Sequence, residues 1–326
     1  MHSTTTRIKF FCIGATCILV ILSIYSLFVG KYPLSPEALL AGDSLQWRVF
    51  LTLRLSRALA GVVGGFALGV TGFVYQTVFR NPLASPDIIG VASGASVGAA
   101  AGILLFGSSL AITACSFGGA LFAVLLALGL SSIDRSGRKS TIVLAGIAVH
   151  ALAQTLLMCL KLLADPEREL ASIEYWIMGS LNGIRGDSLL INLILCLVCV
   201  ILLFFLHRQI ILLSAEEGEA KMLGVSVGRL RLFILLAATL SLTCIISLTG
   251  LISFVGLLAP HAARLLTKDN RPHTMYLSGI LGGILLCGAD LFARSAAATE
   301  LPVSIFTSLL GAPFLLYLLF SKRRSV

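Results

Sequence analysis

NPLASPDIIGVASGASVGAAAG, residues 81–102, joins a helix-breaking start to a run of small apolar residues. Pro82 and Pro86 each lack a backbone N–H and restrict the residue before them, so no regular helix begins there. Glycines follow at four-residue spacing, which places them on one helix face; they are Gly90, Gly94, Gly98 and Gly102. In lipid, such faces mark close helix–helix contacts. The stretch predicts a closely packed membrane helix behind a non-helical entrance, a place where a gate could be built.

Composition places the whole chain in a membrane. Of its 326 residues 57% are hydrophobic and only 12% are charged, against roughly 25% charged in soluble domains. A span needs about 20 apolar residues, and we expect an all-α polytopic protein with about ten transmembrane helices in one domain, residues 1–326. The expected spans are residues 10–29, 58–78, 88–105, 110–130, 141–163, 189–206, 232–248, 251–266, 275–293 and 302–320.

The basic residues indicate how these spans are oriented. Both ends of the chain are basic, with Arg7 and Lys9 at one end and Lys322 near the other. Cytoplasmic loops are enriched in Lys and Arg, which favours an even number of spans and two cytoplasmic termini. The segment 251–266 is the weakest span because it is short and contains Pro260 and His261. The first span lacks an A-x-A site and is too long for a signal peptide, so we expect it to be retained.

Several classes of chemistry find no support in the sequence. The net charge of +9 comes without a basic strip carrying interleaved aromatics, so nucleic acid is not an expected partner. Cys196 and Cys199 form a C-x-x-C with no second pair, and the eight cysteines are expected to be small buried hydrophobes. No H-E-x-x-H motif or complete phosphate-binding loop occurs. His150 is the one candidate for a proton relay inside the spans, and it has no acidic partner nearby.

Two loops stand out by length. The cytoplasmic loop RQIILLSAEEGEAKMLGVSVGRLR, residues 208–231, holds helix-forming residues 217–223 followed by Gly224, a typical C-terminal glycine. Its apolar members would face water unless a partner's groove received them. The outer loop, residues 163–187, contains ASIEYWIMGSLNG, which predicts an amphipathic interfacial helix. That helix could line a vestibule or cap the bundle, and the sequence leaves both open.

Six motifs, taken in order, resemble those of the FecCD family of ABC transporter permeases. They are RLSR at 54–57, NPLASPDIIGVASGASVGA at 81–99, LAGIAVHAL at 144–152, E-A-x-x-L-G at 219–224, GLISFVGLLAPHAARLL at 250–266, and ADLFAR at 289–294 with the segment 300–319. The family includes permeases for iron–siderophore, haem and vitamin B12 uptake. The match covers residues 54–319, and Ser56 departs from the proline usual in the family.

The resemblance implies a type II ABC importer permease in the bacterial cytoplasmic membrane, itself not an enzyme. It implies a second permease subunit, the same chain or a homologue, two cytoplasmic ATPases and an extracytoplasmic solute-binding protein. ATP and magnesium would bind the ATPases, so no cofactor is expected on this chain. An ion-coupled secondary transporter or channel is the alternative from another class, and a membrane-embedded enzyme is disfavoured.

The family's site residues carry over to matching positions. Coupling to the ATPase falls within cytoplasmic helices at about 214–229, on Glu219, Ala220, Met222, Leu223, Gly224, Val225 and Ser226. The cytoplasmic gate falls on Asn81, Pro82, Leu83, Ser140 and Thr141. Docking of the binding protein falls on Arg54, Arg57 and Arg294. Basic residues at an outer rim would steer an acidic partner, whereas a helix ion pair between Asp290 and Arg294 is the competing interpretation.

The cargo is the least determined feature. The spans lack charges or an aromatic cluster that would select one ligand. An iron–siderophore complex is the first choice because it is the commonest cargo in the resembling family. Haem, cobalamin and a small oxyanion stay open.

Overall fold

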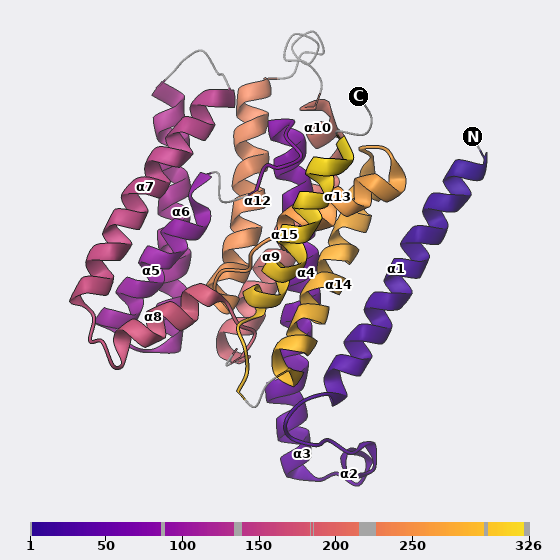
Figure 1. Ribbon diagram of the computed structural model, residues 1–326, viewed down its shortest axis with the longest axis vertical. Helices are drawn as coiled ribbons and strands as arrows, with labels where there is room; N and C mark the ends of the chain where they lie inside the picture. The colour runs from indigo at the N-terminus through magenta and orange to yellow at the C-terminus, as the bar shows by residue number, and fades with distance from the viewer. Residues whose placement is uncertain are drawn as a thin grey trace.

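The protein is described by a computed structural model covering residues 2–85, 89–133, 139–182, 184, 186–214, 226–296 and 299–322 (Figure 1). These residues form helices and connecting turns, with no strand among them. The main helices are α1 (His2–Phe28), α4 (Ser56–Phe79), α5 (Val91–Leu105), α6 (Ser109–Ile133), α7 (Lys139–Leu163), α9 (Gly186–Phe205), α12 (Val227–Thr249), α13 (Val255–Thr267), α14 (Pro272–Ser295) and α15 (Val303–Lys322). The all-α prediction is confirmed.

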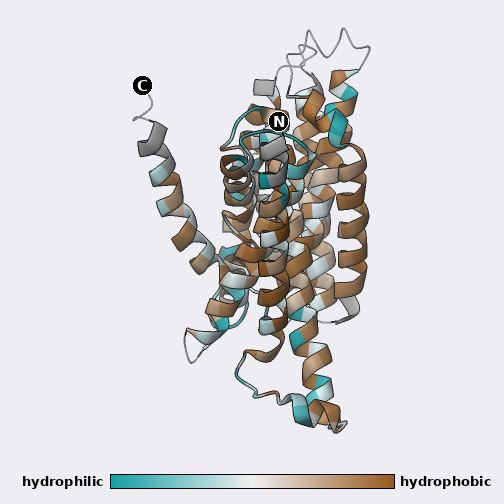
Figure 2. Cartoon of the chain, turned by 90° about the vertical axis from the view of Figure 1, so that its right-hand side faces the viewer, coloured by the Kyte–Doolittle hydropathy of each residue, from teal (hydrophilic) through white to brown (hydrophobic). Residues whose placement is uncertain are grey.

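Each predicted span overlaps one of these helices, although the span predicted at residues 251–266 becomes helical only at Val255. Six stretches of the described chain are helical, long and apolar enough to cross a membrane, and they correspond to α1, α4, α6, α7, α12 and α14. The other four predicted spans correspond to α5, α9, α13 and α15. Hydrophobic residues predominate along the helices (Figure 2). The start of α1 and the end of α15 lie at the same end of the bundle (Figure 1), which we call the inner end after the predicted topology.

The shorter elements gather mainly at the opposite, outer end. They are α2 (Pro36–Leu40), α3 (Ser44–Val49), the π-helix η1 (Phe50–Leu55) and α8 (Glu169–Met178), while α10 (His207–Leu212) lies at the inner end. α3, η1 and α4 run on as one 36-residue helical stretch, Ser44–Phe79. At 1.5 Å per residue this is about 54 Å, far longer than a hydrocarbon core of about 30 Å. α3 therefore projects beyond the bundle with α2 (Figures 1 and 2).

Glycine faces determine the closest helix contacts. A Cβ added at Gly98 of α5 would overlap the carbonyl oxygen of Cys115 on α6, and one at Gly94 would lie 2.5 Å from the carbonyl oxygen of Gly119. α4 meets α14 in the same way, because a Cβ at Gly69 would overlap the carbonyl oxygen of Ser278. The packing predicted for the glycine series of residues 94–102 is confirmed. Gly90 has another role, since its φ of 80° places it at the turn preceding α5.

The eighth crossing differs from the predicted apolar span at residues 251–266. α12 ends at Thr249, and α13 begins only at Val255, with non-helical backbone between them. Ser180, which follows α8 at the outer end, donates its backbone N–H to the Thr249 carbonyl at 2.7 Å. Arg264 of α13 reaches Thr77 in the last turn of α4, at the inner end. The segment thus crosses the bundle with a non-helical first part and a helical second part. Non-helical backbone at such depth is tolerated where protein surrounds it or it lines a watery cavity.

Candidate functional site

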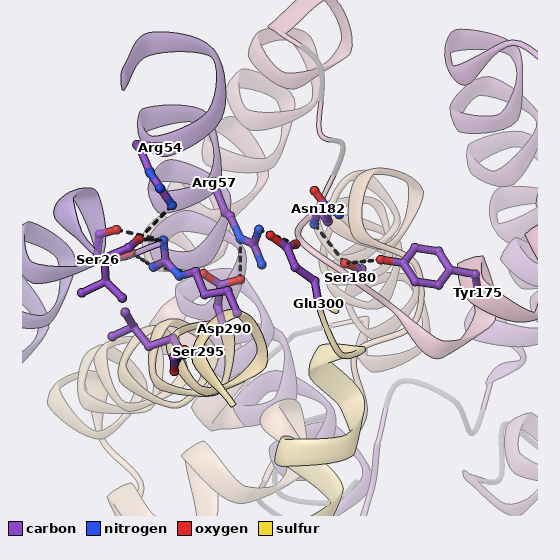
Figure 3. A network of polar contacts seen from close by, with 12 residues as sticks. Ser26, Arg54, Arg57, Tyr175, Ser180, Asn182, Asp290, Ser295 and Glu300 are labelled. Carbon is purple, nitrogen blue, oxygen red and sulfur yellow. Dashed lines mark hydrogen bonds and ion pairs between the residues drawn. The ribbon is translucent and has the colours of Figure 1, made fainter. Parts of the chain in front are cut away.

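A buried ionic network joins α4, α14 and the turn before α15 at the outer end (Figure 3). Arg57 donates from Nε to Asp290 Oδ1 at 2.7 Å and from Nη1 to Glu300 Oε2 at 2.9 Å. Arg294 Nη2 lies 3.3 Å from Asp290 Oδ2. Asp290 therefore forms ion pairs with two arginines, one on its own helix and one on α4.

The same network fastens the end of α1. Arg54 donates to the carbonyl oxygens of Val29 at 2.8 Å and Tyr32 at 2.9 Å. Arg294 donates from Nη1 to the carbonyl oxygens of Ser26 and Val29, at 2.9 and 2.8 Å. These carbonyls lie at or just past the last turn of α1, where a helix leaves acceptors unpaired. The arginines thus complete the hydrogen bonding of a helix end.

This arrangement corrects the picture of an exposed cationic rim. Arg54 and Arg57 are each 8% exposed and Arg294 is 3% exposed, so all three arginines face the protein interior. The ion pair between Asp290 and Arg294, weighed as the competing interpretation, is present. Docking of an acidic partner on these arginines stays a prediction. Glu300, whose side chain is 21% exposed, is the most accessible member of the network's ion pairs.

Sequence reasoning paired Asp290 with Arg294 but missed that Asp290 and Glu300 both pair with Arg57. Arg57 and Asp290 lie 233 residues apart, and Arg57 and Glu300 lie 243 apart. No local spacing rule connects such positions. The one available signal was the position of Asp290 and Glu300 in or beside predicted spans. An unpaired charge is costly there, so each carboxylate should have a basic partner.

The predicted gate residues lie at the inner end. Arg80 ends α4 with a φ of 51°, and the chain then turns away from the helix axis. Asn81 stabilises this turn, because its Oδ1 accepts from the N–H of Leu83 at 3.0 Å and its carbonyl oxygen accepts from the N–H of Ala84 at 3.0 Å. The non-helical entrance predicted around Pro82 is confirmed, while its role as a gate stays a prediction.

The other predicted inner-end residues are only partly visible. Ser140 and Thr141 lie in the first turn of α7, where Thr141 is half-buried and the Ser140 side chain lies outside the described residues. Of the coupling residues, Glu219, Ala220, Met222, Leu223, Gly224 and Val225 lie outside the described residues. Ser226 stands directly before α12 and accepts from the N–H of Leu230 at 3.0 Å. In the sequence, the coupling segment lies between α10 and α12.

A polar cluster that the sequence did not predict lies beside the gate segment. Arg264 donates to the side chains of Gln76, Thr77 and Asn270. Its guanidinium carbon also lies 4.8 Å from the ring centroid of Phe73, within cation–π range. These contacts tie α13 to the end of α4. A cavity of about 290 Å³ adjoins the cluster and is also lined by Arg80, Pro82 and Ser214, so it lies between the gate segment and the start of the coupling loop.

A cavity of about 980 Å³ lies at the outer end. Its walls are the turn between α5 and α6, one side of α8 and the end of α12. Hydroxyl, amide and aromatic groups line it, and they include Ser109, Thr113, Ser172, Tyr175, Trp176, Asn182 and Thr249. Ser180 accepts from the Tyr175 hydroxyl at 3.3 Å and from the N–H of Asn182 at 3.0 Å (Figure 3). The sequence left open whether the amphipathic helix, α8, lines a vestibule or caps the bundle. In the structure α8 lines this cavity.

Comparison with known proteins gives a consistent result. The model of the FecCD transport family matches residues 18–321. The molybdate import system permease protein MolB of Haemophilus influenzae is 33% identical over 95% of each chain. The hemin transport system permease protein HmuU of Yersinia pestis is 34% identical over 94% of each chain. A solved ABC transporter chain in an inward-facing conformation superimposes with a TM-score of 0.86 at 32% identity, covering 95% of this chain and 98% of the other.

Proposed function

Because this chain belongs to the FecCD transport family and is an ABC importer permease, we propose that it carries an iron chelate of the siderophore type across the bacterial cytoplasmic membrane. In this proposal it works with a second permease subunit, two cytoplasmic ATPases and an extracytoplasmic solute-binding protein. ATP hydrolysis takes place on the ATPases, and this chain converts their closure into movement of its helices. Both termini then lie in the cytoplasm.

The size of the outer cavity is the observation that carries the choice of cargo. At about 980 Å³ it lies at the upper end of the range of about 300–1,000 Å³ for small-molecule sites. A tetrahedral oxyanion needs much less room. The hydroxyl and amide groups of the lining can form hydrogen bonds with an oxygen-rich chelate, and Tyr175 and Trp176 offer apolar contact. The hemin permease relative supports a bulky iron-containing cargo in this family.

The coupling role rests on position. The segment 214–229 follows α10 and leads directly into α12, whose Thr239 pairs with Tyr75 of α4 through their side-chain oxygens at 2.6 Å. A displacement of the loop by an ATPase is thereby passed to two spans at once. Such coupling requires the partner to contact the two conformations differently.

The decisive experiment identifies the cargo before measuring transport. The solute-binding protein that works with this chain is identified, purified and titrated with ferric siderophores, hemin, cobalamin and molybdate. The chain is then reconstituted in proteoliposomes with its ATPase, and uptake of the bound compound is followed. We expect tight binding of a ferric siderophore and uptake that requires both ATP and the binding protein.

Other outcomes of the same experiment overturn defined parts of the proposal. Tight binding of molybdate, cobalamin or hemin alone replaces the cargo and leaves the importer mechanism intact. Uptake driven by an ion gradient without the ATPase favours a secondary transporter and overturns the mechanism itself.

A further inference from the structure

The break between α12 and α13 contains a backbone conformation that a bulky residue rarely adopts. Phe254 has φ 65° and ψ −27°, and a positive φ is unusual for any aromatic residue. The N–H of Val255 donates to the carbonyl oxygen of Ser253 at 2.8 Å. Phe254 is therefore the central residue of a γ-turn with positive φ, a rare and strained turn. Strain of this kind persists only where the surroundings hold it, and it gathers at switch regions.

The surroundings that hold Phe254 come from α15. Its aromatic ring lies directly on Gly311, where an added Cβ would overlap the ring. Near the same turn, Ser304 of α15 donates its hydroxyl to the carbonyl oxygen of Leu251 at 2.7 Å. Beyond these contacts α15 stands apart from the other helices toward its C-terminal end (Figure 2). The ring on Gly311 joins α13 to α15, together with the ring pair of His261 and Phe314, while Phe306 of α15 stacks on Phe292 of α14.

The turn lies deep in the bundle and beside a cavity. α13 has 13 residues, which corresponds to about 20 Å from the turn to its inner end, well inside a hydrocarbon core of about 30 Å. A cavity of about 280 Å³ is lined by Phe254, Ser253 and Ile252 from the break, by Leu68 of α4 and Leu242 of α12, and by Ser85. Ser85 closely follows the predicted gate residue Leu83. The strained turn and the gate segment therefore border the same space.

α13 connects this turn rigidly to the inner mouth. The side chain of Gln76 on α4 donates to the carbonyl oxygen of Leu257 at 3.1 Å and also receives a hydrogen bond from Arg264. A Cβ at Gly72 of α4 would overlap the carbonyl oxygen of Gly256, so α13 lies directly on the α4 backbone. Movement of α4 at the gate would consequently carry α13 and Phe254 with it, past Gly311 of α15.

We propose that Phe254 is the mid-membrane seal of this permease, closed while its ring lies on Gly311 and opened when α13 and α15 separate. Its strained backbone holds the ring against Gly311, and Phe254 also lines the cavity that Ser85 borders. The inference goes beyond coupling and docking and rests on the proposed transport function. It assigns to one aromatic ring the barrier between the outer and inner halves of the chain.

The test measures passive leak, which needs no knowledge of the cargo. The complete importer is reconstituted with a water-soluble dye trapped in the vesicles, and dye release is recorded without ATP. We expect Phe254→Ala to raise release at least tenfold, whereas Phe254→Tyr, which keeps the ring, stays at the wild-type rate. Gly311→Ala displaces the ring and raises release similarly. The double variant with Phe254→Ala and Gly311→Ala should leak no more than Phe254→Ala alone, because both changes remove the same contact.

Controls separate the seal from folding and from the proposed function. Gly288→Ala changes a glycine of α14 whose added Cβ would meet no atom within 4 Å, and it should leave the leak unchanged. Phe254→Gly removes the ring while relieving the backbone strain, so it tests the seal in a chain with no new backbone conflict. Wild-type leak in Phe254→Gly and Gly311→Ala, each with an unchanged melting profile, overturns the inference. A failure to transport ferric chelates changes none of these leak rates, so the two failures are distinct.

Discussion

Arg57 shows how a single side chain can hold three segments together. It bonds Asp290 on α14 and Glu300 before α15 while lying on α4 itself. The Arg57 and Asp290 side chains are 9% and 3% exposed, so each charge depends on its partner for the hydrogen bonds that water would otherwise provide. Glu300 is the member that an outside group can reach. The side chains that stabilise the fold here are therefore the same ones that would dock the binding protein.

Replacing Arg57 tests which of these roles dominates. Removing one partner of a buried ion pair costs about 3–5 kcal/mol because the other charge is left uncompensated. We expect Arg57→Ala to lower the melting temperature strongly in a thermal unfolding assay of the purified chain. Arg48→Ala, a change at an exposed arginine on α3, should melt like the wild type. An Arg57→Ala protein of unchanged stability that binds the solute-binding protein weakly would instead identify Arg57 as a docking residue.

The partly exposed carboxylate should behave differently from the buried one. We expect Glu300→Gln to destabilise the protein less than Asp290→Asn, because water can reach the site of Glu300 while Asp290 serves two arginines. The comparison is made by thermal unfolding of both variants. Equal losses for the two carboxyl-to-amide changes would contradict this ranking.

At the scale of elements, two pairs of helices pack backbone against backbone instead of through interlocking side chains. Glycines let α4 lie on α14 and α5 lie on α6 with carbonyl oxygens where a Cβ would otherwise be. Such small-residue interfaces suit membrane helices, which associate through close packing because lipid supplies no hydrophobic drive between them. The helices that meet in this way also carry the gate segment between them, since residues 80–90 link α4 to α5.

Adding one methyl group at this interface should separate the helices. We expect Gly69→Ala to destabilise the chain by about 1–3 kcal/mol, the usual cost of overpacking, because its Cβ would overlap the Ser278 carbonyl oxygen. Gly288→Ala on the same partner helix α14 provides the matched control, having no neighbour within 4 Å of the added Cβ. Thermal unfolding of both variants decides, and equal melting temperatures would contradict backbone contact at Gly69.

The proposed role of residues 214–229 in coupling can be tested by substitution. Charged side chains in place of Met222 and Leu223 would prevent an apolar helix from entering a groove on the ATPase. We therefore expect Met222→Asp with Leu223→Asp to abolish the stimulation of ATP hydrolysis by loaded binding protein, with the melting profile unchanged. Normal ATP-driven uptake by this variant would show that coupling lies elsewhere.

At the scale of the whole molecule, an even number of crossings returns the chain to the end where it began. The predicted topology puts the turn between α2 and α3 outside and both termini inside. A protease site inserted after Gly42, where an added Cβ would meet no atom within 4 Å, should be cleaved from the outer side of intact cells. Sites fused to either terminus should be cleaved only after lysis, and the opposite pattern would invert the topology.

Much of this architecture follows from local sequence. Apolar length alone predicts a helix at each of the ten positions, because lipid requires every backbone group to be satisfied within the segment. The prolines and glycines of residues 81–102 predicted both the non-helical entrance and the close packing behind it, since these residues act on their own backbone and immediate neighbours. The charge pattern likewise predicted that both termini share one end of the bundle.

Tertiary structure alone decided which distant groups meet. The pairing of Arg57 with Asp290 and the ring of Phe254 on Gly311 join positions far apart in the chain. Periodicity and composition describe a segment's own surface, and they carry no information about which surface it will face. Burial of the three outer arginines is the clearest example, because whether a charge at a membrane rim is exposed or paired depends on helices that only the folded chain brings together.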